Sequence, residues 1–193
     1  MDYWTKCLIY YSCQTLALMN FNLIETLQVR TASAAIGAST ARNMGPAGTI
    51  AAARQFLKNL NLAKFNVETP ELFKEELDQA TSDFVKSMPV NAQRWGSCRK
   101  FINIFLRDAV YNKFLSEYFQ LEHTLNWLEV PLDSHIAKGL RAEDGGRSLP
   151  RWETVIHLKE ESSNKYQEFA RTVAARLGTA PVHLDILYWR RPY

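Results

Sequence analysis

The segment WGSCRKFINIFLRDA, from Trp95 to Ala109, decides the fold. Its apolar residues recur at spacings of three and four, and no sustained alternation of apolar and polar residues appears. This periodicity is typical of an amphipathic helix. Because the other long segments repeat it, the sequence predicts an all-α protein. We expect a glycine turn at Gly96 to open onto this helix and to place Lys100 on its first turn.

Helix start and stop residues extend the prediction outward from this segment. Thr69 followed by Pro70 predicts a helix N-terminus, and Pro89 ends that helix. Gly178 is expected to end the last long helix. The helices expected on either side of the central segment span residues 2–35 (as one or two helices), 50–60, 71–87 and 162–177. The buried face of the first of them is expected to comprise Leu8, Leu16, Met19, Leu23 and Leu27.

Length and composition limit the classes of protein that fit. A chain of 193 residues with 47% hydrophobic content suits one compact domain spanning residues 1–193, or two small lobes that share a cleft. The net charge is only +3, so any surface for nucleic acid must be local. We expect helical lobes around a central cleft.

Cysteine spacing and hydropathy favour a cytoplasmic protein. Cys7, Cys13 and Cys98 form no even framework and no metal-binding spacing, which predicts free, mostly buried thiols and no structural zinc. Polar residues interrupt the apolar run over residues 7–24, which also lacks a basic leader and a cleavage site. We therefore expect no membrane span. The protein is expected to be a monomer and to need no cofactor.

Two residues stand out as candidates for chemistry. Asp133 follows Pro131 in the segment VPLDSHI, where it is expected to be the N-cap of a helix with its carboxylate facing outward. Lys100 is expected near a helix N-terminus and beside Arg99. Both features disfavour the charged form of an amine and would make Lys100 a nucleophile.

The segment VPLDSHI, residues 130–136, resembles the Val-Asp-Thr-His-Val segment of helix-hairpin-helix DNA glycosylases. In that family the aspartate is catalytic, which implies this role for Asp133. The segment from Gly96 to Leu106 is similar to the family's hairpin and following helix, whose early lysine is the nucleophile of the bifunctional members. The resemblance thus implies a nucleophilic Lys100 with lyase activity at abasic sites. It covers residues 43–140.

The match has two departures from the usual family pattern. The hairpin, expected over about residues 88–110, contains Gly96 where the family has a Gly-x-Gly pair. Lys100 and Asp133 are 33 residues apart, a wider spacing than in most of the family. The catalytic segment is expected over about residues 128–140. A longer insertion between the two motifs is similar to the archaeal 8-oxoguanine glycosylase branch.

The proposed chemistry also predicts a pocket for a flipped base and a surface for DNA. Such a pocket needs aromatic or apolar walls and a few polar groups. The candidates for it are Trp95, Trp127, Trp152, Trp189, His135 and Asp185. Packing onto the core is the main role expected for Leu184, Leu187 and Trp189. The residues expected to contact DNA are Gly96, Ser97, Arg99, Lys138, Arg141, Arg147 and Arg151. Gly145 and Gly146 should make the last part of this surface mobile.

The resemblance implies excision of a modified base from double-stranded DNA, which would leave an abasic site. Two substrate classes stay open: 8-oxoguanine in base excision repair, and a hypermodified viral base such as glucosylated hydroxymethylcytosine in antiphage defence. One other interpretation is a non-catalytic helix-hairpin-helix module, in which Arg99, Lys100 and the basic loop hold phosphates and Asp133 only caps its helix. Another is a hydrolase built on Cys98, His135 and Asp133.

Overall fold

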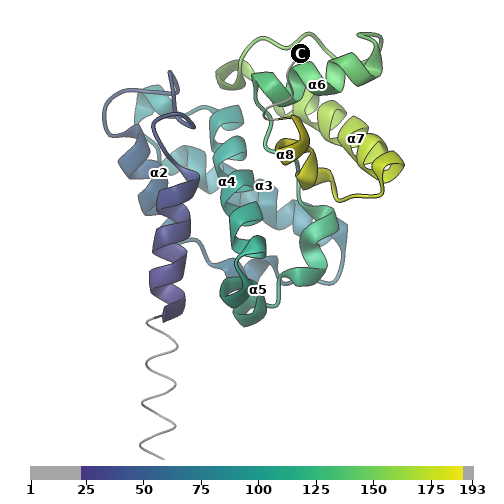
Figure 1. The fold of residues 1–193 in the computed structure, drawn as a ribbon. Helices are drawn as coiled ribbons and strands as arrows, with labels where there is room; N and C mark the ends of the chain where they lie inside the picture. Colours follow the sequence, from purple (N-terminus) through teal and green to yellow (C-terminus); the bar gives the residue numbers. More distant parts are fainter. Residues whose placement is uncertain (1–22, 189–193) are drawn as a thin grey trace, which may run out of the picture.

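The computed structural model describes residues 23–188, and all regular structure in that range is helical, as predicted. Residues 23–35 are helical, and the α-helices that follow are α2 (Thr49–Lys58), α3 (Pro70–Ser87), α4 (Trp95–Tyr111), α5 (Lys113–Phe119), α6 (Ser134–Asp144), α7 (Glu160–Leu177) and α8 (Leu184–Tyr188). The 3-10 turns are η1 (Leu62–Phe65), η2 (Val90–Ala92), η3 (Glu122–Trp127), η4 (Val155–His157) and η5 (Pro181–His183). Figure 1 shows α4 between the amino-terminal helices and the α6–α8 group.

Local capping explains where several helices begin and end. The Thr69 hydroxyl accepts a hydrogen bond from Leu72 N at 3.3 Å, with Pro70 at the first helical position of α3. Gly178 ends α7 with φ 64°, a left-handed conformation that glycine adopts without a steric penalty. The predicted start of α3 and the predicted end of α7 are therefore confirmed, whereas α7 begins at Glu160, two residues before the predicted start.

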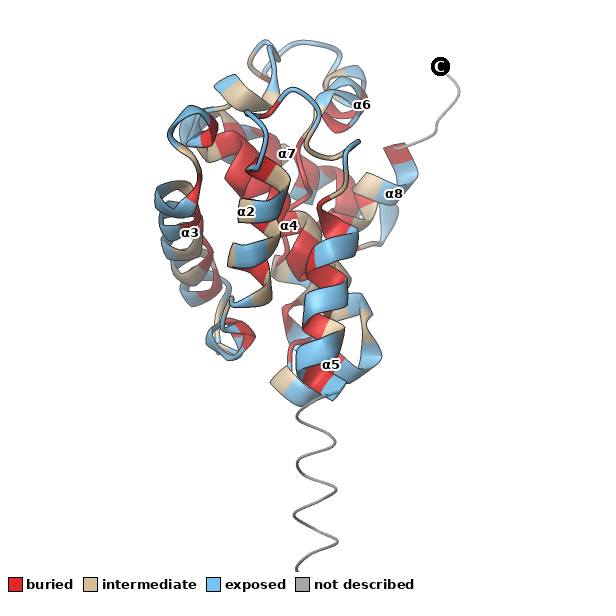
Figure 2. Ribbon diagram, turned by 90° about the vertical axis from the view of Figure 1, so that its left-hand side faces the viewer, coloured by how far each residue is buried: buried red, intermediate tan, exposed pale blue. Residues whose placement is uncertain are grey.

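Two hydrophobic clusters form the interior. One joins helix 23–35 and α2–α5 and includes Phe84 and Phe101; the other joins α6, α7 and α8 and includes Ile136 and Tyr166. Helix α4 contributes many fully buried residues, which Figure 2 shows in red. Because α4 packs against α3, α7 and η4, its residues can reach the boundary between the two clusters.

Gly96 lies inside α4 and not in a turn before it, so the predicted glycine turn is wrong. A Cβ at this position would lie 2.2 Å from the Val155 carbonyl oxygen and 2.7 Å from Leu158 Cβ. The absence of a side chain thus lets η4 and the residue after it pack directly on α4. Gly96 is buried, so its predicted contact with DNA is wrong.

Gly96→Ala should lower the free energy of unfolding by about 1–3 kcal/mol, because the new methyl group overlaps backbone atoms that cannot rotate away. Chemical denaturation of the two proteins measures this difference. Gly37→Ala is the matched control, since a Cβ there meets nothing within 4 Å. Equal stability of Gly96→Ala and wild type would show that this close approach is not needed.

The terminal segments fit the predictions in part. Leu27 is half-buried, but Leu23 is exposed, so its predicted burial is wrong. Leu184 packs in the core as expected, whereas Leu187 is exposed. The remaining predicted core residues Leu8, Leu16, Met19 and Trp189 lie outside the described residues. Within residues 23–188, no helix has both the length and the apolar character needed to cross a membrane.

Candidate active site

Lys100 and Asp133 meet where the two hydrophobic clusters adjoin. Lys100 Nζ lies 3.5 Å from Asp133 Oδ2, which makes an ion pair between the second turn of α4 and the start of α6. The Lys100 side chain is 9% exposed and that of Asp133 is 22% exposed. The two residues singled out by the sequence are therefore neighbours in space, partly shielded from solvent.

The two oxygens of the Asp133 carboxylate make different contacts. Oδ1 accepts hydrogen bonds from His135 N at 2.9 Å and Ile136 N at 3.1 Å, so Asp133 is the predicted N-cap of α6. Oδ2 faces Lys100. Because Oδ1 is fixed by the helix end, the direction of Oδ2 is fixed as well.

The structure corrects the local environment predicted for Lys100. It lies in the second turn of α4, a full turn further from the helix end than predicted, so the helix dipole acts on it more weakly. Arg99 is 2% exposed and points elsewhere: its guanidinium donates to both Glu129 oxygens, at 2.7 and 2.8 Å. The expected effect of Arg99 on the Lys100 charge is therefore not supported.

Arg99 belongs to a buried polar network. Besides Glu129, it donates to Thr81 Oγ1 at 3.0 Å, and its Nη1 lies 2.8 Å from Asp78 Oδ1 without good hydrogen-bond alignment. Asn103 also donates to Glu129, at 3.1 Å. The predicted contact of Arg99 with DNA phosphate is thus wrong, because its donors are already used inside the protein.

Ser97, also predicted to contact DNA, is 1% exposed and buried beside Gly96 in α4. Its hydroxyl has no hydrogen-bond partner among the described residues. The residues predicted to form a DNA-binding hairpin, Gly96, Ser97 and Arg99, are therefore buried in α4.

Two cavities open on the Lys100–Asp133 pair. The first, of about 320 Å³, has a polar lining that includes Ser39, Thr40 and Asp185. The second, of about 460 Å³, is lined among others by Met44 and Trp152. Both have the size of ordinary small-molecule sites, which span ~300–1,000 Å³.

The first cavity contains two charged residues that the sequence interpretation did not select, Arg107 and Asp108. Arg107 forms ion pairs with Asp108, at 2.8 Å, and with Asp185 of α8. Both residues follow Lys100 at helical spacings of seven and eight, so they share one face of α4 with it. That spacing is the signal that could have identified them.

Burial changes the acid–base properties of this cluster. It raises the pKa of Asp185 to about 6; Arg107 opposes this shift and the charge of Asp133 adds to it. Burial also raises the pKa of Asp108, against the effect of Arg107. Two of the three carboxyl groups in the cavity thus hold a proton more readily than free aspartate.

The other predicted pocket residues are divided between different places. His135 is exposed and lines the second cavity together with Lys100, Asp133 and Trp152. Trp95 is half-buried, and the Arg99 guanidinium carbon lies 5.4 Å from its ring centroid. Trp95 therefore lies toward the Arg99 network, and it is not among the described residues that line either cavity.

Trp127, another predicted pocket residue, lines a separate cavity beside Phe73 and Glu129. Its ring packs against those of Phe73 and His123. Its predicted place beside Asp133 is therefore wrong.

The basic loop after α6 is fastened by hydrogen bonds. Arg141 Nη1 donates to the carbonyls of Leu149 and Pro150, at 2.9 and 2.8 Å. Asp144 accepts from the Ser148 hydroxyl and from Ser148 N and Leu149 N, which holds the pKa of the Asp144 carboxyl down at about 2. The predicted mobility of this loop is not supported, and Arg141 has a structural role.

Three of the residues predicted to contact DNA remain at the surface. Lys138, Arg147 and Arg151 are exposed, the first on α6 and the other two on the loop that follows it. Arg42 is also exposed, and it lines the second cavity next to His135. Of these four exposed side chains, Arg42 is the one that lines a cavity beside the Lys100–Asp133 pair.

The interpretation as a Cys98 hydrolase does not fit the structure. Cys98 is a free thiol, as predicted, but it is completely buried in the core, and burial raises the pKa of the thiol to about 12. A neutral thiol without access to solvent is not a nucleophile. Cys7 and Cys13 lie outside the described residues.

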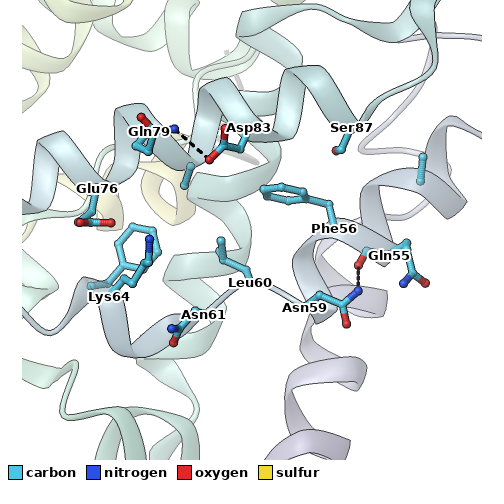
Figure 3. A pocket seen from close by; sticks show the side chains of 13 residues that line it. Gln55, Phe56, Asn59, Leu60, Asn61, Lys64, Glu76, Gln79, Asp83 and Ser87 are labelled. Atoms are coloured by element: carbon cyan, nitrogen blue, oxygen red, sulfur yellow. Dashed lines mark hydrogen bonds between the residues drawn. The ribbon is translucent and has the colours of Figure 1, made fainter.

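A larger cavity, of about 540 Å³, lies between α2 and α3, away from these residues (Figure 3). Phe56 and Leu60 extend into it, and Phe56 stacks on Phe84 with ring centroids 4.3 Å apart. Apart from the Gln79–Asp83 and Gln55–Asn59 hydrogen bonds, its polar side chains form no constellation suited to catalysis.

The cluster formed by Lys100, Asp133, Arg107, Asp108 and Asp185 is therefore the strongest candidate for an active site. Comparisons of the chain with protein-family models, with curated proteins and with solved structures found no match. What is inferred about the chemistry of this cluster therefore rests on its geometry. An amine 3.5 Å from a fixed carboxylate, beside two cavities, suits nucleophilic attack next to a developing positive charge.

Proposed function

We propose that the protein is a DNA glycosylase that flips a modified base out of double-stranded DNA and cleaves the bond between the base and its sugar. The observation that carries the proposal is the 3.5 Å contact between Lys100 Nζ and Asp133 Oδ2 at the junction of two cavities. Cleavage of an N-glycosidic bond builds positive charge on the sugar. A fixed carboxylate such as Asp133 stabilises that charge.

Lys100 is proposed as the nucleophile that captures the sugar. Its ammonium first gives a proton to water, and the neutral amine attacks the sugar carbon as the bond to the base breaks. An N–H proton then passes to the ring oxygen, the ring opens to a Schiff base, and the strand can be cleaved. If a water molecule attacks instead, the product is an abasic site alone. Base excision therefore depends on Asp133, and lyase activity depends on Lys100.

Exposed Lys138, Arg147, Arg151 and Arg42 are proposed to hold the DNA backbone; of these, Arg42 lines the second cavity. They replace the hairpin residues whose burial prevents such contacts. The alternative of a non-catalytic DNA-binding module loses Arg99 as a phosphate ligand, because Arg99 is paired internally, but it keeps the exposed arginines of the loop after α6.

The function is tested by incubating the protein with duplexes that contain 8-oxoguanine, alkylated bases or glucosylated hydroxymethylcytosine. DNA binding and abasic sites are measured on the same samples. We expect abasic sites with at least one modified duplex and none with unmodified DNA. Binding to all duplexes with no abasic site in any of them would favour the binding module.

Lys100→Gln should remove strand cleavage and covalent trapping, because an amide cannot form a Schiff base. Borohydride reduction of wild type on substrate DNA should give a covalent complex that the variant lacks. Lys113→Gln is the matched control, since Lys113 is exposed on α5. Equal trapping of Lys100→Gln and wild type would rule out Lys100 as the nucleophile; failure to trap wild type would favour attack by water.

A further inference from the structure

Asp185 occupies a place in the first cavity that the chemistry described so far does not use. It lines the cavity together with Lys100 and Asp133, and its side chain is 17% exposed. One oxygen, Oδ2, pairs with Arg107. The other, Oδ1, has no hydrogen-bond partner among the described residues, and it is not among the buried unsatisfied atoms. A cavity-lining carboxyl with one engaged and one free oxygen is suited to proton transfer.

Helix α8 is held so that Asp185 stays at this place. The preceding residue, Leu184, is fully buried in the second hydrophobic cluster. Tyr188 packs its ring against Gly139 of α6, where a Cβ would lie only 2.8–3.0 Å from ring carbons. Arg107 then ties Asp185 to α4. Three contacts with different elements therefore fix the carboxyl relative to Lys100 and Asp133.

Burial and the surrounding charges make Asp185 hold its proton to a higher pH than free aspartate does. The groups that face it are Arg107, Asp108, Lys100 and Tyr111 from α4, and Asp133 from the start of α6. Burial and the two other carboxylates raise its pKa, the two cations lower it, and the pKa is about 6. This value lies close to the range in which a carboxyl works best as an acid at physiological pH.

We propose that Asp185 is the acid that protonates the departing base, and that Arg107 is its positioning residue. This inference rests on the proposed glycosylase function. The bond between the base nitrogen and the sugar carbon breaks, and its electron pair passes to the base. The proton of the Asp185 carboxyl forms the new bond to the base. Asp185 is left as a carboxylate next to Arg107, and the Lys100 amine or water captures the sugar.

The test is the pH dependence of single-turnover base release, measured for wild type and Asp185→Asn on the same duplex. The wild-type rate should fall as the pH rises through about 6, because the protonated acid is lost. Asp185→Asn should be slower below that pH by on the order of 10²-fold and should lack the falling limb. Asp185→Glu, which restores a carboxyl, should regain a falling limb. Glu117→Gln, at an exposed position of α5, is the control and should behave as wild type.

The outcomes separate this inference from the proposed function. If wild type releases base and Asp185→Asn keeps both the rate and the falling limb, Asp185 is not the acid, while the glycosylase proposal stands. If Asp185→Asn is slower but keeps the limb, its role is only structural, and the inference fails. If wild type releases no base from any modified duplex, the glycosylase proposal fails and this inference fails with it.

Discussion

Asp133→Asn abolishes base release while the protein folds normally: we expect the single-turnover rate to fall on the order of 10³-fold. The substitution keeps the shape of the side chain and an oxygen that can accept from His135 N and Ile136 N, so the cap of α6 survives. It removes the negative charge that faces Lys100 and that would stabilise the sugar cation. This variant therefore tests the effect of the Asp133 charge on the rate without disturbing the fold.

Asp83→Asn is the matched control for this prediction. Asp83 is an exposed aspartate on α3 that pairs with Lys86 and lines neither of the two cavities at the Lys100–Asp133 pair. It should release base at the wild-type rate. Circular dichroism and thermal unfolding check that both variants fold. Near-normal turnover by Asp133→Asn would exclude Asp133 as the group that stabilises the sugar charge.

Glu129→Ala should lower the free energy of unfolding by about 3–5 kcal/mol, the largest effect on stability that we expect. Glu129 is 4% exposed and accepts two hydrogen bonds from Arg99 and one from Asn103. Its loss leaves the buried Arg99 guanidinium with only the Asp78 contact as charge compensation. Urea denaturation of wild type and variant measures the difference.

Two controls distinguish the buried charge from a simple loss of side-chain volume. Glu117→Ala breaks an exposed pair with Lys113, so it should change stability by less than about 1 kcal/mol. Arg99→Met combined with Glu129→Leu removes both charges and should recover much of the loss caused by Glu129→Ala. A loss below about 1 kcal/mol for Glu129→Ala would contradict the assigned role of the pair.

The Arg99–Glu129 pair also predicts that the free energy of unfolding depends on pH. Burial alone would raise the pKa of the Glu129 carboxyl, but Arg99 and the hydrogen bonds outweigh burial and lower it. The unfolded chain therefore binds a proton at higher pH than the folded protein does. The stabilisation is fully present above the ordinary pKa of glutamate and is lost as the pH falls through the lowered pKa. The difference in the free energy of unfolding between wild type and Glu129→Gln, measured by urea denaturation, should accordingly become smaller as the pH is lowered into the acid range.

Helix ends could be predicted from the sequence because capping is local. The boundary signals at Thr69, Asp133 and Gly178 depend on residues within one turn, and the structure has all three as expected. The all-α class follows from the periodicity in the same way. The proximity of Lys100 to Asp133 was suggested by the order of two motifs, and the structure brings them together.

The errors concern contacts between residues far apart in the chain. Gly96 was taken for a turn residue because its neighbour Val155 cannot be inferred locally. Arg99 was placed at the surface because its partner Glu129 is 30 residues away. Burial of a charged residue depends on such a partner, so composition alone assigns it to the surface.

Base excision at the Lys100–Asp133 pair is tested most directly by mass spectrometry of free bases released from a panel of oxidised, alkylated and phage-modified duplex DNAs. Wild type and Asp133→Asn are incubated with the same panel. We predict that wild type releases one modified base, or one closely related group of bases, and that Asp133→Asn releases none. Release of no base by wild type, or equal release by both proteins, would contradict base excision at the Lys100–Asp133 pair.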